Sequence, residues 1–149
     1  MVTVGWREWA ALPHFGVQRI RAKIDTGART SALHVEAQWR IVEQGAPWVA
    51  FELRPHRRRA RIVEAAAPIC DERMVTDSGG NRSLRLFVRT TLALAGQIRE
   101  IDINLTNRRE MLFPLLIGRS ALGGHCAVDP ARSFIHGRIQ RSPPAAASA

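Results

Sequence analysis

The sequence predicts an all-β domain in which many short strands form a closed barrel or a sandwich. In several segments apolar and polar residues alternate with the period of a β-strand, most clearly in residues 17–24 and 98–105. Gly-containing turn sequences separate such segments at short intervals, and helical patterns are scarce. The chain has 149 residues, of which 46% are hydrophobic, so it can form one domain with an apolar core.

Six segments carry strand signals in chain order. Residues 17–24 and 98–105 alternate, and residues 84–94 are rich in Val, Thr, Phe and Leu. Residues 112–117 form a short apolar run that suits a strand buried on both faces. The predicted strands are residues 17–24, 48–53, 61–65, 84–94, 98–105 and 112–117.

Turns and one short helix separate or follow these strands. Residues 77–81, Asp-Ser-Gly-Gly-Asn, have the strongest turn composition and predict the tip of a hairpin. Residues 119–122 predict a short helix that ends at a pair of glycines, and residues 30–36 are a second helical candidate. We expect one domain over residues 1–140 and a mobile, low-complexity tail over residues 141–149.

The net charge and the number of cysteines limit which classes of function the sequence supports. The formal net charge is +9 and is almost entirely due to Arg, which attracts nucleic acid or acidic peptides but also fits an Arg-rich proteome. The basic residues 54–61 are expected in an exposed loop. Two cysteines do not make a disulfide framework, and we find no membrane-length apolar run or signal-peptide pattern. These features predict a cytoplasmic protein without membrane association.

The tripeptide Asp25-Thr26-Gly27 directly follows the first alternating strand and suggests catalysis. Such a strand delivers a carboxylate to a tight turn, Thr offers a hydroxyl that can hold a partner loop, and Gly lets the backbone approach closely. Two carboxylates a few ångströms apart cannot both ionise, so they share one proton. The ionised member takes a proton from the attacking water, and the neutral member donates to the scissile carbonyl.

A second element strengthens this interpretation. Residues 115–124, Leu-Leu-Ile-Gly-Arg-Ser-Ala-Leu-Gly-Gly, read as an apolar strand that ends at Gly118 and leads into a short helix. In each half of an aspartic protease, such a strand passes behind the loop that bears the Asp. The alternative is that Asp25 only caps a turn in a monomeric barrel.

These residues resemble a known family. The segments IDTGARTSALH and LLIGRSAL are similar to the retropepsin-type aspartic peptidases. With GWREW, DERMV, RTTLAL, LTNRREM and VDPARSF, they resemble more closely a bacterial family long labelled ATP-dependent zinc proteases, from about Gly5 to Phe134. That family occurs beside or fused to ATP-grasp ligases that add glutamates to a ribosomal protein.

The resemblance implies a closed retropepsin-like barrel with one short C-terminal helix and aspartic endopeptidase activity. Asp25 would be the catalytic aspartate, with Thr26 and Gly27 shaping its loop, and residues 116–118 would form the supporting strand. Residues 76–82 would be a flap over the substrate. The substrate-binding candidates are Ala28, Arg29, Asp77, Ser78, Gly79, Gly80, Arg108 and Arg119.

If Asp25 is the only catalytic carboxylate, one chain supplies half of the site. A second copy across a two-fold axis would place two Asp25 residues side by side, so a homodimer is expected. Asp77-Ser78-Gly79 could be the second triplet of a two-lobed enzyme, but the chain has only one supporting apolar-Gly strand. We therefore expect Asp77 to be exposed at the hairpin tip.

The arginines suggest the substrate. Arg29, Arg82, Arg108, Arg109 and Arg119 can line a positive groove, and guanidinium groups bind carboxylates. Acidic peptides, in particular glutamate-extended protein tails, are the expected substrates, and an ATP-grasp glutamate ligase is a candidate partner. Two alternatives stay open: a non-catalytic module that binds acidic or ribosomal partners, and a nucleic-acid binder.

Nucleic acid is the less favoured partner because the few aromatic residues are not interleaved with the arginines. The family label mentions zinc and ATP, but no His-Glu-x-x-His or P-loop sequence is present, and the histidines lack ligand spacing. We expect neither a metal nor another cofactor.

Overall fold

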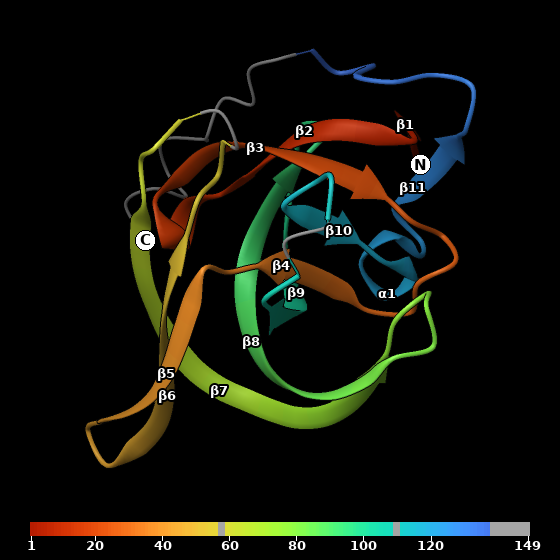
Figure 1. Ribbon diagram of the computed structural model, residues 1–149. Helices are drawn as coiled ribbons and strands as arrows, with labels where there is room; N and C mark the ends of the chain where they lie inside the picture. The colour runs from red at the N-terminus through yellow and green to blue at the C-terminus, as the bar shows by residue number, and fades with distance from the viewer. Residues whose placement is uncertain (57–58, 109–110, 138–149) are drawn as a thin grey trace.

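The structure is a computed structural model that describes residues 1–56, 59–108 and 111–137 (Figure 1). Apart from one short helix, α1, and one 3-10 turn, η1, its regular elements are strands, which confirms the nearly all-β prediction. The strands are β1 (Val2–Gly5), β2 (Arg7–Leu12), β3 (Val17–Ile24), β4 (Ser31–His34), β5 (Ala37–Glu43), β6 (Ala46–Leu53), β7 (Val63–Thr76), β8 (Arg82–Leu94), β9 (Gln97–Thr106), β10 (Leu115–Ile117) and β11 (Cys126–Asp129); η1 is Pro13–Phe15 and α1 is Arg119–Leu122.

Within the described residues, nine strands form one sheet in the order β2-β3-β10-β4-β9-β8-β7-β6-β5, and β1 pairs with β11 in a separate parallel ribbon. β2 also pairs with β8, where Ala10 lies opposite Leu94 and Ala11 opposite Ala93. The two long strands, β7 and β8, curve around the body of the molecule, and the β5–β6 hairpin projects from it (Figure 1).

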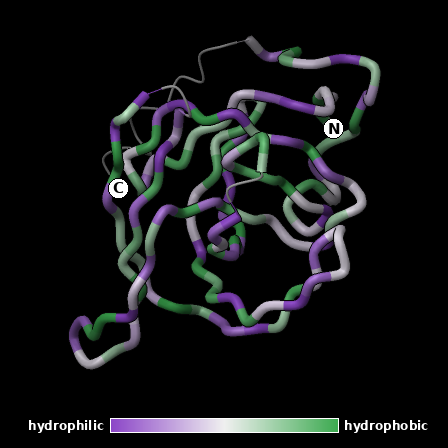
Figure 2. The backbone as a smooth tube through the Cα atoms, viewed as in Figure 1, coloured by the Kyte–Doolittle hydropathy of each residue, from purple (hydrophilic) through white to green (hydrophobic). Residues whose placement is uncertain are grey.

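The alternation in the sequence has the expected consequence for the core. In β3, Ile20, Ala22 and Ile24 are buried, whereas Arg21 and Lys23 are exposed. Hydrophilic and hydrophobic residues alternate along many strands (Figure 2). Because a strand turns successive side chains to opposite faces, this pattern gives the sheet one apolar face that surrounds the core.

Residues 30–36, a helical candidate from the sequence, do not form a helix. They contain the strand β4, which lies between β10 and β9 and pairs with both. Ser31, Ala32 and Leu33 are all buried. A strand covered on both faces carries no alternating pattern, so the local sequence gave no sign of it.

Other boundaries also differ from the predictions. β10 is shorter than residues 112–117, and β7 extends far beyond the predicted strand over residues 61–65. Besides β4, four strands were not predicted: β1, β2, β5 and β11. The short helix over residues 119–122 is confirmed as α1.

The basic segment connects β6 to β7. Residues 54–56 and 59–61 form no helix or strand, and Arg59 and Arg61 are exposed, as expected for a loop. Residues 57–58 and the predicted tail, residues 141–149, lie outside the described residues. Throughout the described part of the chain, every helix is too short and too polar to cross a membrane.

Candidate active site

Asp25 lies directly after β3, in the loop that leads to β4. Its backbone N–H donates a hydrogen bond to the carbonyl of Ile117 in β10 at 2.9 Å, and its carbonyl accepts from the N–H of Ala28 at 3.2 Å. The N–H of Gly27 donates to Asp25 Oδ1 at 2.9 Å. This hydrogen bond orients the carboxylate of Asp25. The residue is half-buried, so the carboxylate is still open to solvent.

The junction between β10 and α1 packs against this loop. The N–H of Gly118 donates to the buried hydroxyl of Ser31 at 3.1 Å. The next two backbone N–H groups donate to loop carbonyls, Arg119 to Ala28 at 2.8 Å and Ser120 to Arg29 at 3.1 Å. The backbones come so close that a Cβ at position 118 would lie 2.5 Å from the carbonyl oxygen of Thr30. Glycine is therefore required at position 118.

Arg119 also holds the loop through its side chain. Its Nη1 donates to the carbonyls of Thr26 at 3.1 Å and Gly27 at 3.2 Å. Arg119 was predicted to bind substrate, and these contacts give it a positioning role for the Asp25 turn. Arg29 and Thr26, the other polar candidates in this loop, are exposed.

The predicted flap is the hairpin of β7 and β8, and Asp77 organises its tip. Asp77 Oδ1 accepts from the N–H groups of Gly79 at 2.9 Å and Asn81 at 3.0 Å. The side chain of Asp77 is only 9% exposed, so the expectation that it is solvent-exposed was wrong. Ser78, Gly79 and Gly80 are exposed at the turn, and Gly80 has a φ of +83° that favours glycine.

The pKa of Asp77 lies below its ordinary value. The hydrogen bond from the N–H of Asn81 has the largest effect, and the N–H of Gly79 and the charge of Arg108 act in the same direction, while desolvation opposes them. All three groups stabilise the ionised carboxylate. At neutral pH the tip therefore carries a fixed negative charge.

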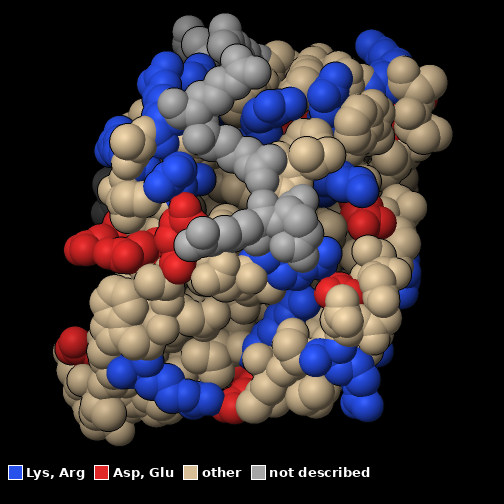
Figure 3. Space-filling model, viewed as in Figure 1, with Lys and Arg blue, Asp and Glu red and all other residues tan. Residues whose placement is uncertain are grey.

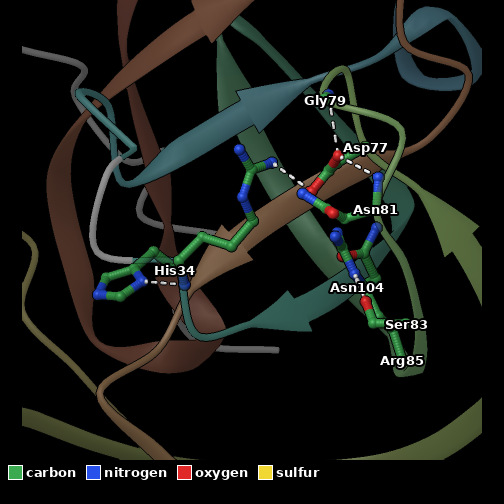
Figure 4. A network of polar contacts seen from close by, with 8 residues as sticks. His34, Asp77, Gly79, Asn81, Ser83, Arg85 and Asn104 are labelled. Atoms are coloured by element: carbon green, nitrogen blue, oxygen red, sulfur yellow. Dashed lines mark hydrogen bonds and ion pairs between the residues drawn. The ribbon is translucent and has the colours of Figure 1, made fainter.

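The hairpin tip contacts Arg108, which follows β9, and Arg108 in turn contacts His34 at the end of β4 (Figure 4). Arg108 Nη1 lies 3.8 Å from Asp77 Oδ2, and the backbone N–H of Arg108 donates to His34 Nδ1 at 3.1 Å. His34 Nε2 in turn lies 3.1 Å from a carboxylate oxygen of Glu36. Arg108, a predicted substrate-binding residue, thus lies at the flap; its neighbour Arg109 is outside the described residues.

A second polar chain joins the flap to the Asp25 loop. Arg85, in β8, is 6% exposed and donates from Nη1 to Asn104 Oδ1 at 3.0 Å. Asn104, in β9, donates from Nδ2 to the carbonyl of Ser31 at 2.8 Å and to Thr30 Oγ1 at 3.4 Å. Figure 4 shows Arg85, Ser83 and Asn104 grouped below the hairpin tip.

Arg85 and Asn104 were not predicted from the sequence. In the alternating pattern both lie on the polar side of their strands, near Ser83 and Arg89 in β8 and near Asp102 and Thr106 in β9, so no local signal marked them as buried. The pKa of Arg85 is below its ordinary value, mainly because of burial and also because of the nearby charge of Arg108, while Asp77 partly offsets these effects.

The two Asp-containing turns are stabilised by different contacts. Among the described residues, no hydrogen bond or ion pair joins Asp25 to Asp77, and each is held by its own turn. Asp77 has no supporting strand of the kind that Asp25 has in β10. In the same part of the chain, no group of three or more His, Cys, Asp or Glu side chains could hold a metal ion.

A strand-borne Asp-Thr-Gly turn packs against an apolar-Gly strand in a small, nearly all-β chain, which is the arrangement that the sequence predicted for this loop and its support. The chain belongs to the RimB-like family, whose model, described as retropepsin-like aspartic endopeptidase RimB, matches residues 3–139. This match confirms the family that the sequence motifs suggested.

Curated relatives are larger proteins. The chain is 34% identical over 139 residues to a protein of Desulfotalea psychrophila and 36% identical over 135 residues to one of Shewanella pealeana, both named probable alpha-L-glutamate ligase. These matches include 93% and 90% of this chain but only 30% of each relative. The ligase name therefore belongs to longer proteins, and this chain matches less than a third of their length.

A solved structure has the same fold. It is a protein of unknown function from Legionella pneumophila, 30% identical to this chain, with a TM-score of 0.77. The match covers 90% of this chain and 97% of the Legionella chain.

Proposed function

We propose that this chain is one subunit of a homodimeric aspartic endopeptidase that cleaves acidic protein segments. The observation that carries the proposal is the Asp25 turn, whose backbone is held by β10 and α1 and whose carboxylate remains open to solvent. The family description supports the same activity. The retropepsin-like barrel stays a prediction, supported by the pairing of β2 with β8.

The chemistry needs two copies of Asp25. Two carboxylates brought together across a two-fold axis share one proton, because two negative charges so close are unfavourable. The ionised carboxylate takes a proton from water as the water attacks the scissile carbonyl, and the protonated one donates to the carbonyl oxygen. Water adds to the carbonyl carbon, the C–N bond breaks, and the amine leaves with a proton.

The substrate is proposed from charge and from the relatives. The sequence carries a formal net charge of +9, and Arg and Lys side chains are distributed over the face shown in Figure 3. A positive surface raises the local concentration of acidic peptides. The similarity to glutamate ligases suggests action together with an ATP-grasp ligase, on protein tails to which glutamates have been added.

The test compares purified wild-type protein with Asp25→Asn on glutamate-extended and unextended peptides. Asn keeps an oxygen that can accept from the N–H of Gly27, so the fold should persist while cleavage stops. Asp102→Asn is the matched control, because Asp102 is exposed and pairs with Arg89 on the sheet surface. Equal product from wild type and Asp25→Asn would end the proposal.

Mixing the two proteins tests the dimer. If both carboxylates are needed, a heterodimer of wild type and Asp25→Asn is inactive, and the rate falls with the square of the wild-type fraction. A linear fall would indicate that each chain acts alone. Peptide that binds without being cleaved by either version would favour the non-catalytic binding module instead.

A further inference from the structure

Arg85 is a buried cation with unused hydrogen-bond donors. The residue is 6% exposed. Among the described residues two of its nitrogens have partners: Nε donates to Ser83 Oγ at 3.1 Å and Nη1 to Asn104 Oδ1 at 3.0 Å. Among the described residues nothing accepts a hydrogen bond from Nη2. Nη2 is not fully buried, so it keeps access to solvent.

Arg85 has no directly contacting counterion among the described residues. Both partners of Arg85 are neutral, and no carboxylate of the described residues forms an ion pair with it. The charges of the ion-paired residues Arg108 and Asp77 also act on Arg85, in opposite directions. Because a buried charge without a counterion is unfavourable, a bound anion would stabilise this region.

The position of Arg85 connects this charge to the candidate active site. Asn104, which accepts from Arg85, donates to Thr30 and Ser31 in the segment that follows the Asp25 turn. Arg85 is therefore one side chain away from that segment, and it lies below the tip of the β7–β8 hairpin (Figure 4). A peptide held under the hairpin would pass this guanidinium.

We propose that Arg85 forms a carboxylate-binding subsite under the flap, in which Nη2 donates to an acidic group of the peptide and Arg108 adds positive charge at the entrance. A planar guanidinium with free donors suits a carboxylate better than a neutral amide. Ser83 and Asn104 orient the guanidinium plane. This inference rests on the proposed function, since it assumes that a peptide lies beside Asp25.

The experiment measures binding and not cleavage, so that it stands apart from the test of catalysis. All proteins carry Asp25→Asn, and fluorescence anisotropy at fixed ionic strength follows three labelled peptides: tetraglutamate with an amidated C-terminus, its tetraglutamine counterpart, and tetraglutamine with a free C-terminus. The third peptide distinguishes a terminal carboxylate from a side-chain carboxylate. Cleavage by the Asp25 protein is assayed separately.

Arg85→Gln is expected to weaken binding of tetraglutamate about tenfold or more and to leave tetraglutamine unchanged, since a charge-assisted hydrogen bond is lost. Arg89→Gln is the matched control. It removes the same charge from the same strand, but Arg89 is exposed and pairs with Asp102. It should leave the preference for the acidic peptide as it was.

Thermal unfolding shows whether the Arg85→Gln protein is folded. If it is not, Arg85→Lys replaces it in the binding experiment. Lys keeps the charge without the planar fork and should retain part of the preference. The inference is overturned if Arg85→Gln or Arg85→Lys folds and discriminates the peptides as well as the parent does. It is also overturned if the parent binds tetraglutamate and both tetraglutamine peptides equally, even where the Asp25 protein cleaves peptides.

Discussion

The backbone N–H of Asp25 donates to the carbonyl of Ile117 at 2.9 Å, which ties the candidate catalytic turn to a strand from the other end of the chain. In the register of the parallel pair of β3 and β10, Ile24 lies opposite Ile117. The position of the Asp25 carboxylate therefore depends on the β10–α1 junction as much as on its own turn. Substitutions in that junction should affect activity without touching a catalytic group.

Gly118→Ala is the sharpest such substitution. The new Cβ would lie 2.5 Å from the carbonyl oxygen and 2.7 Å from the carbonyl carbon of Thr30, and backbone atoms cannot rotate away. We expect the free energy of unfolding to fall by about 1–3 kcal/mol and peptide cleavage to fall further, because the Asp25 turn is displaced. Urea unfolding and initial rates measure the two effects.

Gly123→Ala is the control for this substitution. Its Cβ would lie 3.3 Å from the carbonyl oxygen of Arg119, and its φ of −56° is open to any residue. It should retain stability to within about 0.5–1 kcal/mol. A Gly118→Ala protein as stable and as active as wild type would show that the close approach at Thr30 is not needed.

Local sequence was sufficient to place the candidate catalytic turn and its supporting strand. Asp25 follows a strand whose alternation is clear, and Gly118 ends an apolar run before a recognisable short helix, so both could be placed from neighbouring residues alone. Family membership followed from the same motifs. Whether Asp25 is catalytic stays a prediction that neither the fold nor the relatives decide.

Long-range contacts explain what the sequence did not predict. β4 is a strand because β9 and β10 flank it, and β1 pairs with β11 from the far end of the chain. The turn at Asp77 was predicted from its composition. Its burial was not, since that depends on the hairpin folding back toward Arg108. No local sequence pattern indicates such a long-range contact.

Glu8→Gln should destabilise the protein at a site remote from Asp25. The carboxylate of Glu8 is fully buried and accepts three backbone hydrogen bonds, from Gly5 at 2.7 Å, Ile135 at 3.1 Å and His136 at 3.3 Å. Gln replaces one accepting oxygen by a donor that faces an N–H group. We expect the free energy of unfolding to fall by about 1–3 kcal/mol.

The control for Glu8→Gln is Glu43→Gln, the same change at an exposed end of β5. Chemical denaturation of both variants should show a shifted midpoint for position 8 alone. Equal midpoints would mean that the three backbone N–H groups at Glu8 find other acceptors when the carboxylate is changed, and that the N-terminal strands do not depend on it.

The flap tip should lose order at acid pH. Hydrogen bonds from Asn81 and Gly79, with the charge of Arg108, hold the pKa of Asp77 below its ordinary value. A carboxyl whose pKa is lower in the folded state stabilises that state above its unfolded pKa, near about pH 4, and this stabilisation is lost as the pH falls through the folded value. The tip should therefore be ordered at neutral pH and loosen only in acid.

NMR can follow this loss through the amide resonances of Gly79 and Asn81, from about pH 6 to about pH 2. In Asp77→Asn the amide oxygen can still accept both hydrogen bonds, but it does not titrate over this range, so the transition should disappear from these two resonances. Asp102→Asn, a matched change on the sheet surface, should leave the transition in place. If the resonances of Gly79 and Asn81 titrate identically with and without the Asp77 carboxyl, another group controls the tip, because within the described residues only Asp77 places a carboxylate oxygen on both N–H groups.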